Sequence, residues 1–170
     1  MKKVIMGIGN AGAGKTTVLK PFAEKYGYTY ICPDEIRQEL SGDALDQSRM
    51  KEVWDIAYAR VAEALAADQT VVFDSTFAKQ QDRRNCIVFV RSKGAEIVEG
   101  LYIDTPLELT RERNTQRDRQ VPGHALDRMH GYLQDAPPST DDGFDAILTV
   151  DGQQDLNEIE RLMADGIRPK

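Results

Sequence analysis

The sequence predicts an α/β protein in which a parallel β-sheet is covered by helices on both faces. Short apolar runs rich in β-branched and aromatic residues recur along the 170 residues, and the stretches between them carry apolar residues at spacings of three and four. Strands that alternate with helices are typical of parallel sheets buried on both faces. We find no internal repeat, low-complexity tract or interdomain linker, so we expect one domain over residues 1–170.

Five runs have the composition of buried strands, and each is five to eight residues long. The first follows Lys2 and enters a glycine loop, so we interpret it as a strand and not as the apolar part of a signal peptide. The predicted strands are KVIMGI (3–8), YTYIC (28–32), TVVFD (70–74), EIVEGLYI (96–103) and AILTV (146–150).

The helical period appears between these runs. Apolar side chains repeat at spacings of three and four over residues 50–65, 126–133 and 156–163, and each set forms one face that we expect to pack in the core. A helical pattern also follows the first glycine loop, at residues 17–27. Residues 151–167 are predicted as a closing helix, so that a closing strand and helix span about 145–165.

The net charge of −6 argues against a broad nucleic-acid surface, because such surfaces are basic. The acidic residues are, however, concentrated in two parts of the chain. Residues 28–69 hold four basic and nine acidic side chains, and residues 136–170 hold three and eight. Residues 1–27 hold five Lys and one Glu, so a local basic site stays possible.

The two cysteines, Cys32 and Cys86, are too few and too far apart for a disulfide framework or a zinc site. We expect both to be buried thiols of a reducing compartment. No apolar stretch approaches the roughly 18 residues of a membrane span. We therefore expect a cytoplasmic protein with no membrane partner, and the sequence makes no prediction of its oligomeric state.

The segment GNAGAGKT, residues 9–16, matches the G-x-x-x-x-G-K-[ST] pattern of a phosphate-binding P-loop. Glycines let successive backbone N–H groups face an anion, and the helix that follows presents its positive end. Lys15, expected to face solvent, supplies charge to the β- and γ-phosphates, and the Thr16 hydroxyl is a candidate Mg²⁺ ligand. A preceding strand and a following helix favour this interpretation over an incidental glycine turn. The predicted nucleotide-binding residues of the loop are Gly9, Asn10, Ala11, Gly12, Ala13, Gly14, Lys15, Thr16 and Thr17.

The segment CPDEIRQEL, residues 32–40, puts Asp34 directly after a proline, shortly beyond the end of the second predicted strand. Ligands of open parallel sheets lie beyond the carboxyl ends of the strands. Asp34 could there accept a proton from a hydroxyl that attacks the γ-phosphate, and Arg37 could hold an anionic part of the same acceptor. The alternative is that Asp34 caps a helix and Arg37 forms a surface ion pair. The local sequence does not separate the two.

Asp74 ends another apolar strand, in the segment VVFDSTF (71–77). A carboxylate at this position could bind a Mg²⁺-bound water, so we assign Asp74 to the substrate site. The alternative is a capping aspartate.

An arginine cluster lies in TRERNTQRDRQVP, residues 110–122, and contains Arg111, Arg113, Arg117 and Arg119. Arg113 and Arg117 are four residues apart, so we expect them to share a helix face. Charge runs are usually solvated helix faces. Two arginines on one face also suit a lid that closes over a transferring phosphate.

Taken in order, these segments resemble the polynucleotide kinase-like family of P-loop kinases, which includes the 5′-hydroxyl polynucleotide kinase domains of phage and animal enzymes. The resemblance runs from about Lys3 to Val150 and covers the P-loop, the D-x-x-R of DEIRQEL, the strand-ending DST, RNTQR followed by VP, and APPSTDDGFDAI. It implies a three-layer P-loop NTPase fold. In that fold a five-stranded parallel sheet of order 2-3-1-4-5 has helices on both faces and a helical or loop lid, here at about 111–122.

The resemblance also implies roles for individual residues. Asp34 matches the general base that activates the 5′-hydroxyl, and Arg37 matches the arginine that grips the phosphate on the 3′ side of the acceptor nucleotide. Arg113 and Arg117 match lid arginines that engage the donor nucleotide and its phosphates. Asp34, Lys15 and Arg117 are accordingly the expected catalytic residues.

Two positions depart from the family pattern. Several members have Asn-Arg where this chain has Cys32 and Pro33, and Phe77 replaces the Asn of D-x-T-N. We expect both positions to border the acceptor, so the departures leave the acceptor's identity open.

The leading hypothesis is ATP- and Mg²⁺-dependent phosphoryl transfer to a 5′-hydroxyl of DNA or RNA, with a short or single-stranded acceptor because the basic surplus is modest. Within the same resemblance, the hydroxyl could belong to a modified base, a nucleoside or a small metabolite. A different class, a non-kinase P-loop ATPase or nucleotide switch, would turn over ATP without a phosphorylated product. A binding protein with a degenerate site is disfavoured by the intact Lys15, Thr16 and Asp34.

Overall fold

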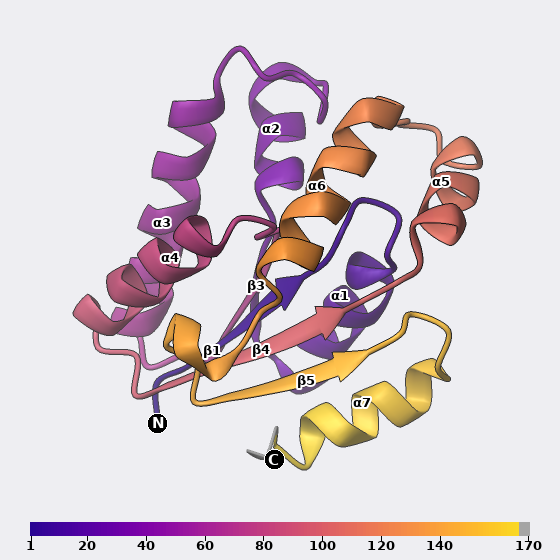
Figure 1. Ribbon diagram of the computed structural model, residues 1–170. Helices are drawn as coiled ribbons and strands as arrows, with labels where there is room; N and C mark the ends of the chain where they lie inside the picture. Colours follow the sequence, from indigo (N-terminus) through magenta and orange to yellow (C-terminus); the bar gives the residue numbers. More distant parts are fainter. Residues whose placement is uncertain (167–170) are drawn as a thin grey trace.

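The computed structural model describes residues 1–166 and contains a five-stranded sheet in which every strand pairs in parallel, in the order β2-β3-β1-β4-β5 (Figure 1). This confirms the predicted class and strand order. The predicted runs differ from the observed strands by at most one residue at either end. The strands are β1 (Lys3–Ile8), β2 (Thr29–Ile31), β3 (Val71–Asp74), β4 (Ile97–Ile103) and β5 (Ala146–Val150).

Helices connect the strands, and the three apolar stripes lie within α3, α6 and α7. The closing helix begins later than predicted, because the Asp155 side chain accepts hydrogen bonds from the backbone N–H groups of Asn157 and Glu158 and so caps it. Residue 167 of that prediction lies outside the described residues. None of the helices within residues 1–166 is both long and apolar enough to span a membrane. The helices are α1 (Lys15–Tyr26), α2 (Pro33–Ser41), α3 (Met50–Ala66), α4 (Gln80–Ser92), α5 (Leu107–Thr115), α6 (Gly123–Asp135), the 3₁₀ turn η1 (Thr140–Asp142) and α7 (Leu156–Ala164).

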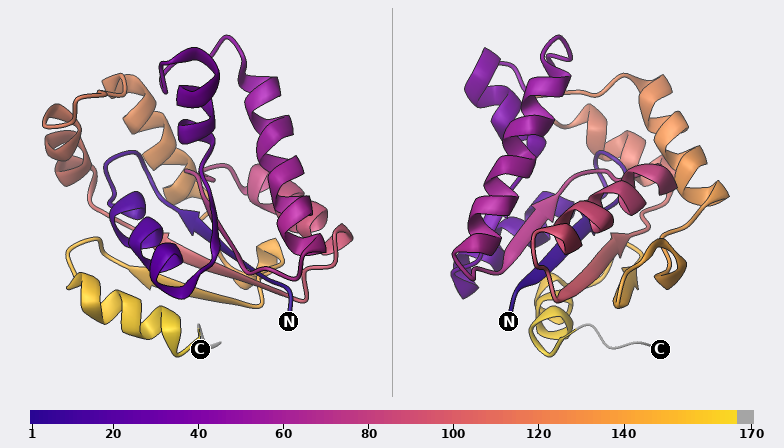
Figure 2. Two further views of the ribbon diagram at one scale, coloured as in Figure 1. Left: turned by 180° about the vertical axis from the view of Figure 1, so that it is seen from behind. Right: turned by 90° about the vertical axis from the view of Figure 1, so that its left-hand side faces the viewer.

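The sheet separates two apolar cores. Side chains alternate across a strand, so Val4, Met6 and Ile8 of β1 face one core while Ile5 faces the other. The first core is covered by α3, α4 and α6, and the second by α1 and α7 (Figure 2). Both faces of the sheet are therefore covered, as the near-continuous apolar strands predict.

All five strands end at the same edge of the sheet because they run parallel. In Figure 1 the arrowheads point toward the loop between β1 and α1 and toward α5 and α6. The segments that follow the five strands therefore meet at one edge, which is where ligands of such sheets bind.

A buried arginine joins three segments behind this edge. Arg83 of α4 is fully buried, and its Nε donates to Asp142 Oδ2 at 2.7 Å. Its Nη1 donates to the carbonyls of Phe77 and Ala78 at 3.1 and 3.0 Å, and its Nη2 to the carbonyl of Ala136 at 2.6 Å. This group of contacts, the Arg83 node, fixes the β3–α4 loop, in which Phe77 has a φ of +43°.

Candidate active site

A cleft of about 1120 Å³ opens at the carboxyl edge of the sheet. The P-loop, the start of α2, the end of β3 and the lid segment 111–122 all contribute to its walls. Of the residues predicted from sequence to form the site, only Gly9 and Asn10 do not line it. The fold thus brings together residues from four separate segments. The predicted residues that line the cleft are Ala11, Gly12, Ala13, Gly14, Lys15, Thr16, Thr17, Asp34, Arg37, Asp74, Arg113 and Arg117.

The P-loop backbone has a conformation that requires glycine at two positions. Gly12 has a φ of +79° and Gly14 a φ of +104°, in the left-handed region that disfavours side chains. A Cβ on Gly12 would also lie 2.9 Å from the Thr110 carbonyl oxygen. Helix α1 begins at Lys15, directly after the loop. Its free N–H groups and positive end therefore face the cleft, which suits a phosphate group.

Gly9 and Asn10 lie behind the cleft. Asn10 Nδ2 donates to the Leu126 carbonyl at 2.9 Å, and its Oδ1 accepts from the Ala11 N–H. A Cβ on Gly9 would lie 2.9 Å from the carbonyl oxygen of Ile103. In this arrangement Asn10 ties the P-loop to α6 and Gly9 allows the loop to approach β4, so their direct contact with nucleotide stays a prediction.

We expected Lys15 to face solvent, but the structure shows it buried. Its residue is only 8% exposed, because Nζ folds back and donates to the Asn10 carbonyl at 3.2 Å. An incoming phosphate would replace that carbonyl as the acceptor, and a charged acceptor forms the stronger hydrogen bond with an ammonium.

One carboxylate oxygen of Asp74 accepts hydrogen bonds from both Thr16 and Tyr30. Thr16 Oγ1 donates to Asp74 Oδ2 at 2.8 Å, and the Tyr30 hydroxyl donates to the same oxygen at 2.5 Å. Burial of Tyr30 and the neighbouring Asp74 raise the pKa of the phenol, so it stays a donor. Asp74 is 2% exposed and ends β3 without capping a helix, which excludes the capping alternative. A hydroxyl beside a carboxylate is a set of hard oxygen ligands that fits Mg²⁺.

Asp34 lies in the first turn of α2 without capping it. The cap position is Cys32, and Pro33 is the first helical residue, so the proposed capping role for Asp34 is wrong. Within residues 1–166, the hydrogen-bond partner of the Asp34 carboxylate is Arg37 Nη1. The Asp34 side chain is 57% exposed, which leaves the carboxylate accessible from the cleft.

Arg37 is buried, so the alternative of a surface ion pair is wrong as well. Its side chain is 8% exposed. Besides Asp34, Nη1 donates to the Ala44 carbonyl at 3.3 Å and Nη2 contacts Met50 Sδ at 3.4 Å, while Nε has no partner among the described residues. Sulfur is a weak acceptor. Arg37 is therefore a buried cation whose hydrogen-bonding capacity is incompletely used, and it lines the cleft.

The segment predicted as a lid, residues 111–122, is not one continuous helix. Helix α5 ends at Thr115, so Arg117 lies beyond it and the expected shared helix face is wrong. The turn that follows is closed by Asn114, whose side chain exchanges hydrogen bonds of 2.8 and 2.9 Å with the backbone of Val121. Both Arg113 and Arg117 nevertheless line the cleft.

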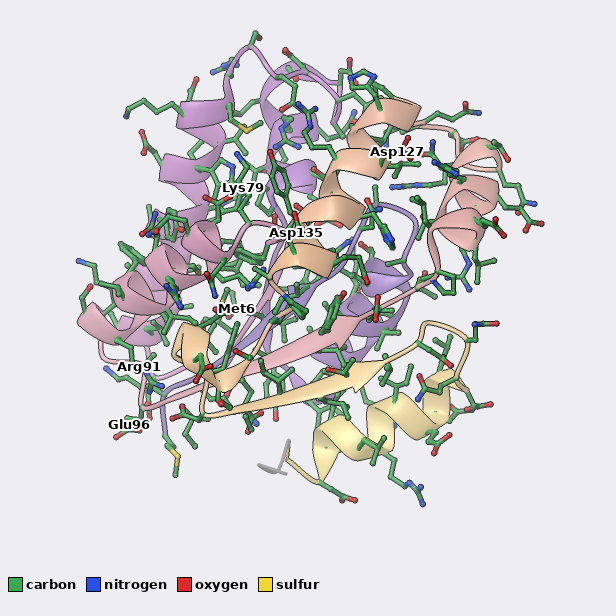
Figure 3. All side chains as sticks on the ribbon, viewed as in Figure 1. Met6, Lys79, Arg91, Glu96, Asp127 and Asp135 are labelled. Carbon is green, nitrogen blue, oxygen red and sulfur yellow. The ribbon has the colours of Figure 1, made fainter. Side chains whose placement is uncertain are left out.

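The lid arginines have different partners. Arg113 donates to the carbonyls of Ala13 and Gly152 at 3.2 and 3.0 Å, and so links the P-loop to the loop after β5. Arg117 lines the cleft, and its side chain has no partner among residues 1–166. Arg111 forms an ion pair of 2.6 Å with Asp127, which Figure 3 shows on α6.

The end of the cleft near α2 and α3 is largely apolar. Trp54 contributes an aromatic ring there and packs edge-on against Phe77, with ring centroids 6.0 Å apart. Cys32 and Pro33 border the cleft as expected, but Phe77 does not: it is buried behind Trp54. The pKa of the Cys32 thiol is raised to about 11, because the thiol is buried and Asp74 lies nearby. The apolar lining here consists of Cys32, Pro33, Ala44, Leu45, Met50, Trp54 and Met129.

The fold and the cleft together define a P-loop kinase-like domain. Residues 4–136 match the family described as "AAA domain" (AAA_33), and the chain belongs to that family. A P-loop kinase fold implies ATP binding and usually Mg²⁺. None of the curated proteins matches the chain.

Solved structures share the fold at low sequence identity. A structure of the Pnkp1/Rnl/Hen1 RNA repair complex matches with a TM-score of 0.72 and 21% identity, and the match covers 85% of this chain but 46% of the other. A proposed kinase from Chloroflexus aurantiacus matches with a TM-score of 0.74 and 16% identity, covering 96% and 94% of the two chains. A gluconokinase from Sinorhizobium meliloti matches with a TM-score of 0.60 and 23% identity, covering 94% and 87%.

Proposed function

We propose that the protein transfers the γ-phosphoryl group of ATP to the 5′-hydroxyl of a DNA or RNA acceptor. The observation that supports this best is the pair formed by Asp34 and Arg37 in the same cleft as the P-loop. An exposed carboxylate can hold the proton of an attacking hydroxyl, and the buried arginine beside it can bind a phosphate of the same acceptor.

The remaining residues fit the requirements of phosphoryl transfer, which are positioning and charge stabilisation. Lys15 and the N–H groups at the start of α1 would hold the β- and γ-phosphates, and Thr16 with Asp74 would hold Mg²⁺. When bound, Mg²⁺ neutralises charge that develops on the phosphate oxygens. Arg117, free of partners among the described residues, is a cation that can approach the transferring group.

The apolar end of the cleft favours a nucleotide over a polyhydroxylated acceptor. A sugar acid needs many hydrogen-bond partners, and a site that recognises one presents matching polar groups. Here the lining near Arg37 is mainly aliphatic with the ring of Trp54. Nucleobases have flat faces that pack on such surfaces. The structural match to an RNA repair complex also supports a nucleic-acid acceptor. The match to a gluconokinase shows that the same fold is found in a kinase with a small-molecule name.

A panel of acceptors tests this proposal. The protein is incubated with γ-labelled ATP and Mg²⁺ together with 5′-hydroxyl oligodeoxynucleotides and oligoribonucleotides, nucleoside 3′-monophosphates, nucleosides, hydroxymethylated DNA, gluconate and shikimate. We expect label at the 5′ end of the oligonucleotides, and none with Lys15→Ala. Label confined to a small metabolite or a modified base would contradict the proposal. ATP hydrolysis without any labelled acceptor would favour a non-kinase ATPase.

A further inference from the structure

A second, smaller pocket opens beside the main cleft. This side pocket, of about 200 Å³, lies between the β3–α4 connection and α6. Thr76, Ala125, Arg128 and Met129 line both spaces, so the two are continuous. The full lining of the side pocket is Thr76, Ala78, Lys79, Asp82, Ala125, Arg128, Met129 and Tyr132.

Two cations in the side pocket have no ion-pair partner among residues 1–166. Lys79 and Arg128 are both exposed, and neither side chain forms a hydrogen bond or an ion pair within the part of the chain that is described. Of the described residues, Asp82 is the only carboxylate that lines the pocket, so the local charge is positive.

An aromatic ring lies next to these cations. Lys79 Nζ lies 5.2 Å from the centroid of the Tyr132 ring, a cation–π geometry that holds the ammonium at the pocket (Figure 3 shows Lys79 beside α6). Ala125, Arg128, Met129 and Tyr132 are three or four residues apart on α6 and therefore share one face. The pocket thus combines two positive charges with an aromatic and aliphatic wall.

We propose that the side pocket binds a second phosphodiester of the acceptor strand, beyond the phosphate that Arg37 binds. Lys79 and Arg128 donate to the phosphate oxygens, and Tyr132 packs against the adjoining base. Phosphate recognition by cations together with base packing on aromatic rings is the chemistry of single-strand binding. This inference rests on the proposed function, and it gives the preferred substrate as an acceptor longer than one nucleotide.

The test compares acceptors of increasing length. KM is measured for a nucleoside 3′-monophosphate, a dinucleotide and a pentanucleotide, each with a 5′-hydroxyl, for the original protein, Lys79→Ala, Arg128→Ala and Lys93→Ala. Lys93 is the matched control, because it is exposed and lies 5.6 Å from the Phe89 ring centroid but lines neither pocket. Fluorescence anisotropy of a labelled pentanucleotide with each protein gives a binding readout that is independent of turnover.

We expect KM to fall with acceptor length in the original protein and in Lys93→Ala. Lys79→Ala and Arg128→Ala raise the KM of the pentanucleotide about three- to tenfold relative to that of the nucleoside 3′-monophosphate, and each weakens the salt dependence of single-strand binding by a slope of about 0.7. An unchanged length dependence in both variants, with oligonucleotides still phosphorylated, would overturn the side-pocket assignment alone. Absence of label on every nucleotide acceptor would overturn the proposed function and this inference together.

Discussion

Two buried arginines in this protein have opposite surroundings. Arg83 is fully buried behind the sheet edge, where a carboxylate and three carbonyl oxygens accept its hydrogen bonds. Arg37 is almost as buried, but its acceptors are an exposed carboxylate, one carbonyl at 3.3 Å and a thioether sulfur, and its Nε has no partner among residues 1–166.

This difference in hydrogen-bond acceptors indicates that Arg83 stabilises the fold and that Arg37 is available to bind a ligand. A buried charge is costly unless its partners replace the lost water, and the Arg83 node supplies them within the fold. Arg37 faces a cleft, and its unfilled hydrogen-bonding capacity can be completed by an anionic ligand. We expect Arg83 to determine stability and Arg37 to determine acceptor binding.

The largest effect is expected at the Arg83 node. Arg83→Met should lower the free energy of unfolding by about 3–5 kcal/mol, because the buried Asp142 carboxylate loses its fully buried ion-pair partner and keeps only Gln80 and the half-exposed Arg84 beside it. Chemical denaturation measures this loss. Adding Asp142→Leu should restore only part of it, since the carbonyls of Phe77, Ala78 and Ala136 still lack their donor.

The matched control is the neighbouring Arg84. Its Nε lies 3.7 Å from Asp142 Oδ1, but its side chain is 46% exposed. Arg84→Ala should cost less than about 1 kcal/mol, as is usual for exposed pairs. If Arg83→Met costs no more than Arg84→Ala, the node does not have the structural role assigned to it.

The next effect concerns a third arginine, which has no partner among the described residues. Arg117→Ala should reduce phosphoryl transfer on the order of 10³-fold, if Arg117 stabilises charge on the transferring group. Arg111→Ala should stay within a few-fold of the original rate, because Arg111 is exposed and paired with Asp127. Single-turnover rates at saturating ATP make the comparison. Equal losses in the two variants would indicate a diffuse basic surface.

Arg37→Met tests the other side of the comparison. We expect a loss of stability of about 1 kcal/mol or less, because the exposed partner Asp34 can be solvated in its absence. The KM for an acceptor with a 3′-phosphate should rise about 10- to 100-fold, the usual value of a hydrogen bond to a charged group. An acceptor without that phosphate should be affected much less. A stability loss as large as that of Arg83→Met would remove the distinction between the two sites.

The smallest expected effect concerns the two cysteines, one close to Arg37 and one close to Arg83. Cys32 occupies the N-cap position of α2, the helix that carries Arg37, and Cys86 lies one turn from Arg83 in α4. Burial raises the pKa of Cys32 to about 11 and that of Cys86 to about 12, so both are neutral thiols near pH 7. Since the thiolate is the nucleophile, Cys32 alkylation should accelerate about tenfold per pH unit up to about pH 11.

Mass spectrometry of the native protein after iodoacetamide treatment measures both rates. Cys86 is fully buried and should stay unmodified while the protein is folded. Rapid alkylation of Cys32 near pH 7 would contradict the environment described for that end of the cleft.

Much of the site was predictable because its residues follow strands. The P-loop is a local pattern. Asp34 closely follows one apolar run and Asp74 ends another, and the carboxyl ends of these runs meet at one edge of a parallel sheet. The strand order was not readable from alternation alone and came from the family resemblance. Residues of the segment 111–122 line the cleft, and their role as a lid stays a prediction. The position of Arg117 was not predictable, because the turn after Thr115 depends on side-chain hydrogen bonds of Asn114.

The contacts that the sequence did not predict join distant segments. Arg83 and Asp142 are 59 residues apart, and nothing local distinguishes Arg83 from Arg84. A signal was present, because Arg83 occupies the same helical stripe as Cys86, Ile87 and Val90, all of which are buried. The hydrogen bond from Tyr30 to Asp74 and the burial of Phe77 behind Trp54 are tertiary contacts that no spacing rule gives.

The measurement that tests the account most directly is transfer by Asp34→Asn. The substitution keeps the shape of the side chain and removes the proton acceptor, so ATP binding and thermal stability should stay close to those of the original protein. Transfer to a 5′-hydroxyl acceptor should fall by roughly 10²- to 10⁴-fold, the usual contribution of a positioned base. A stable Asp34→Asn variant that binds ATP and retains full transfer would contradict the assignment of Asp34 as the base beside Arg37.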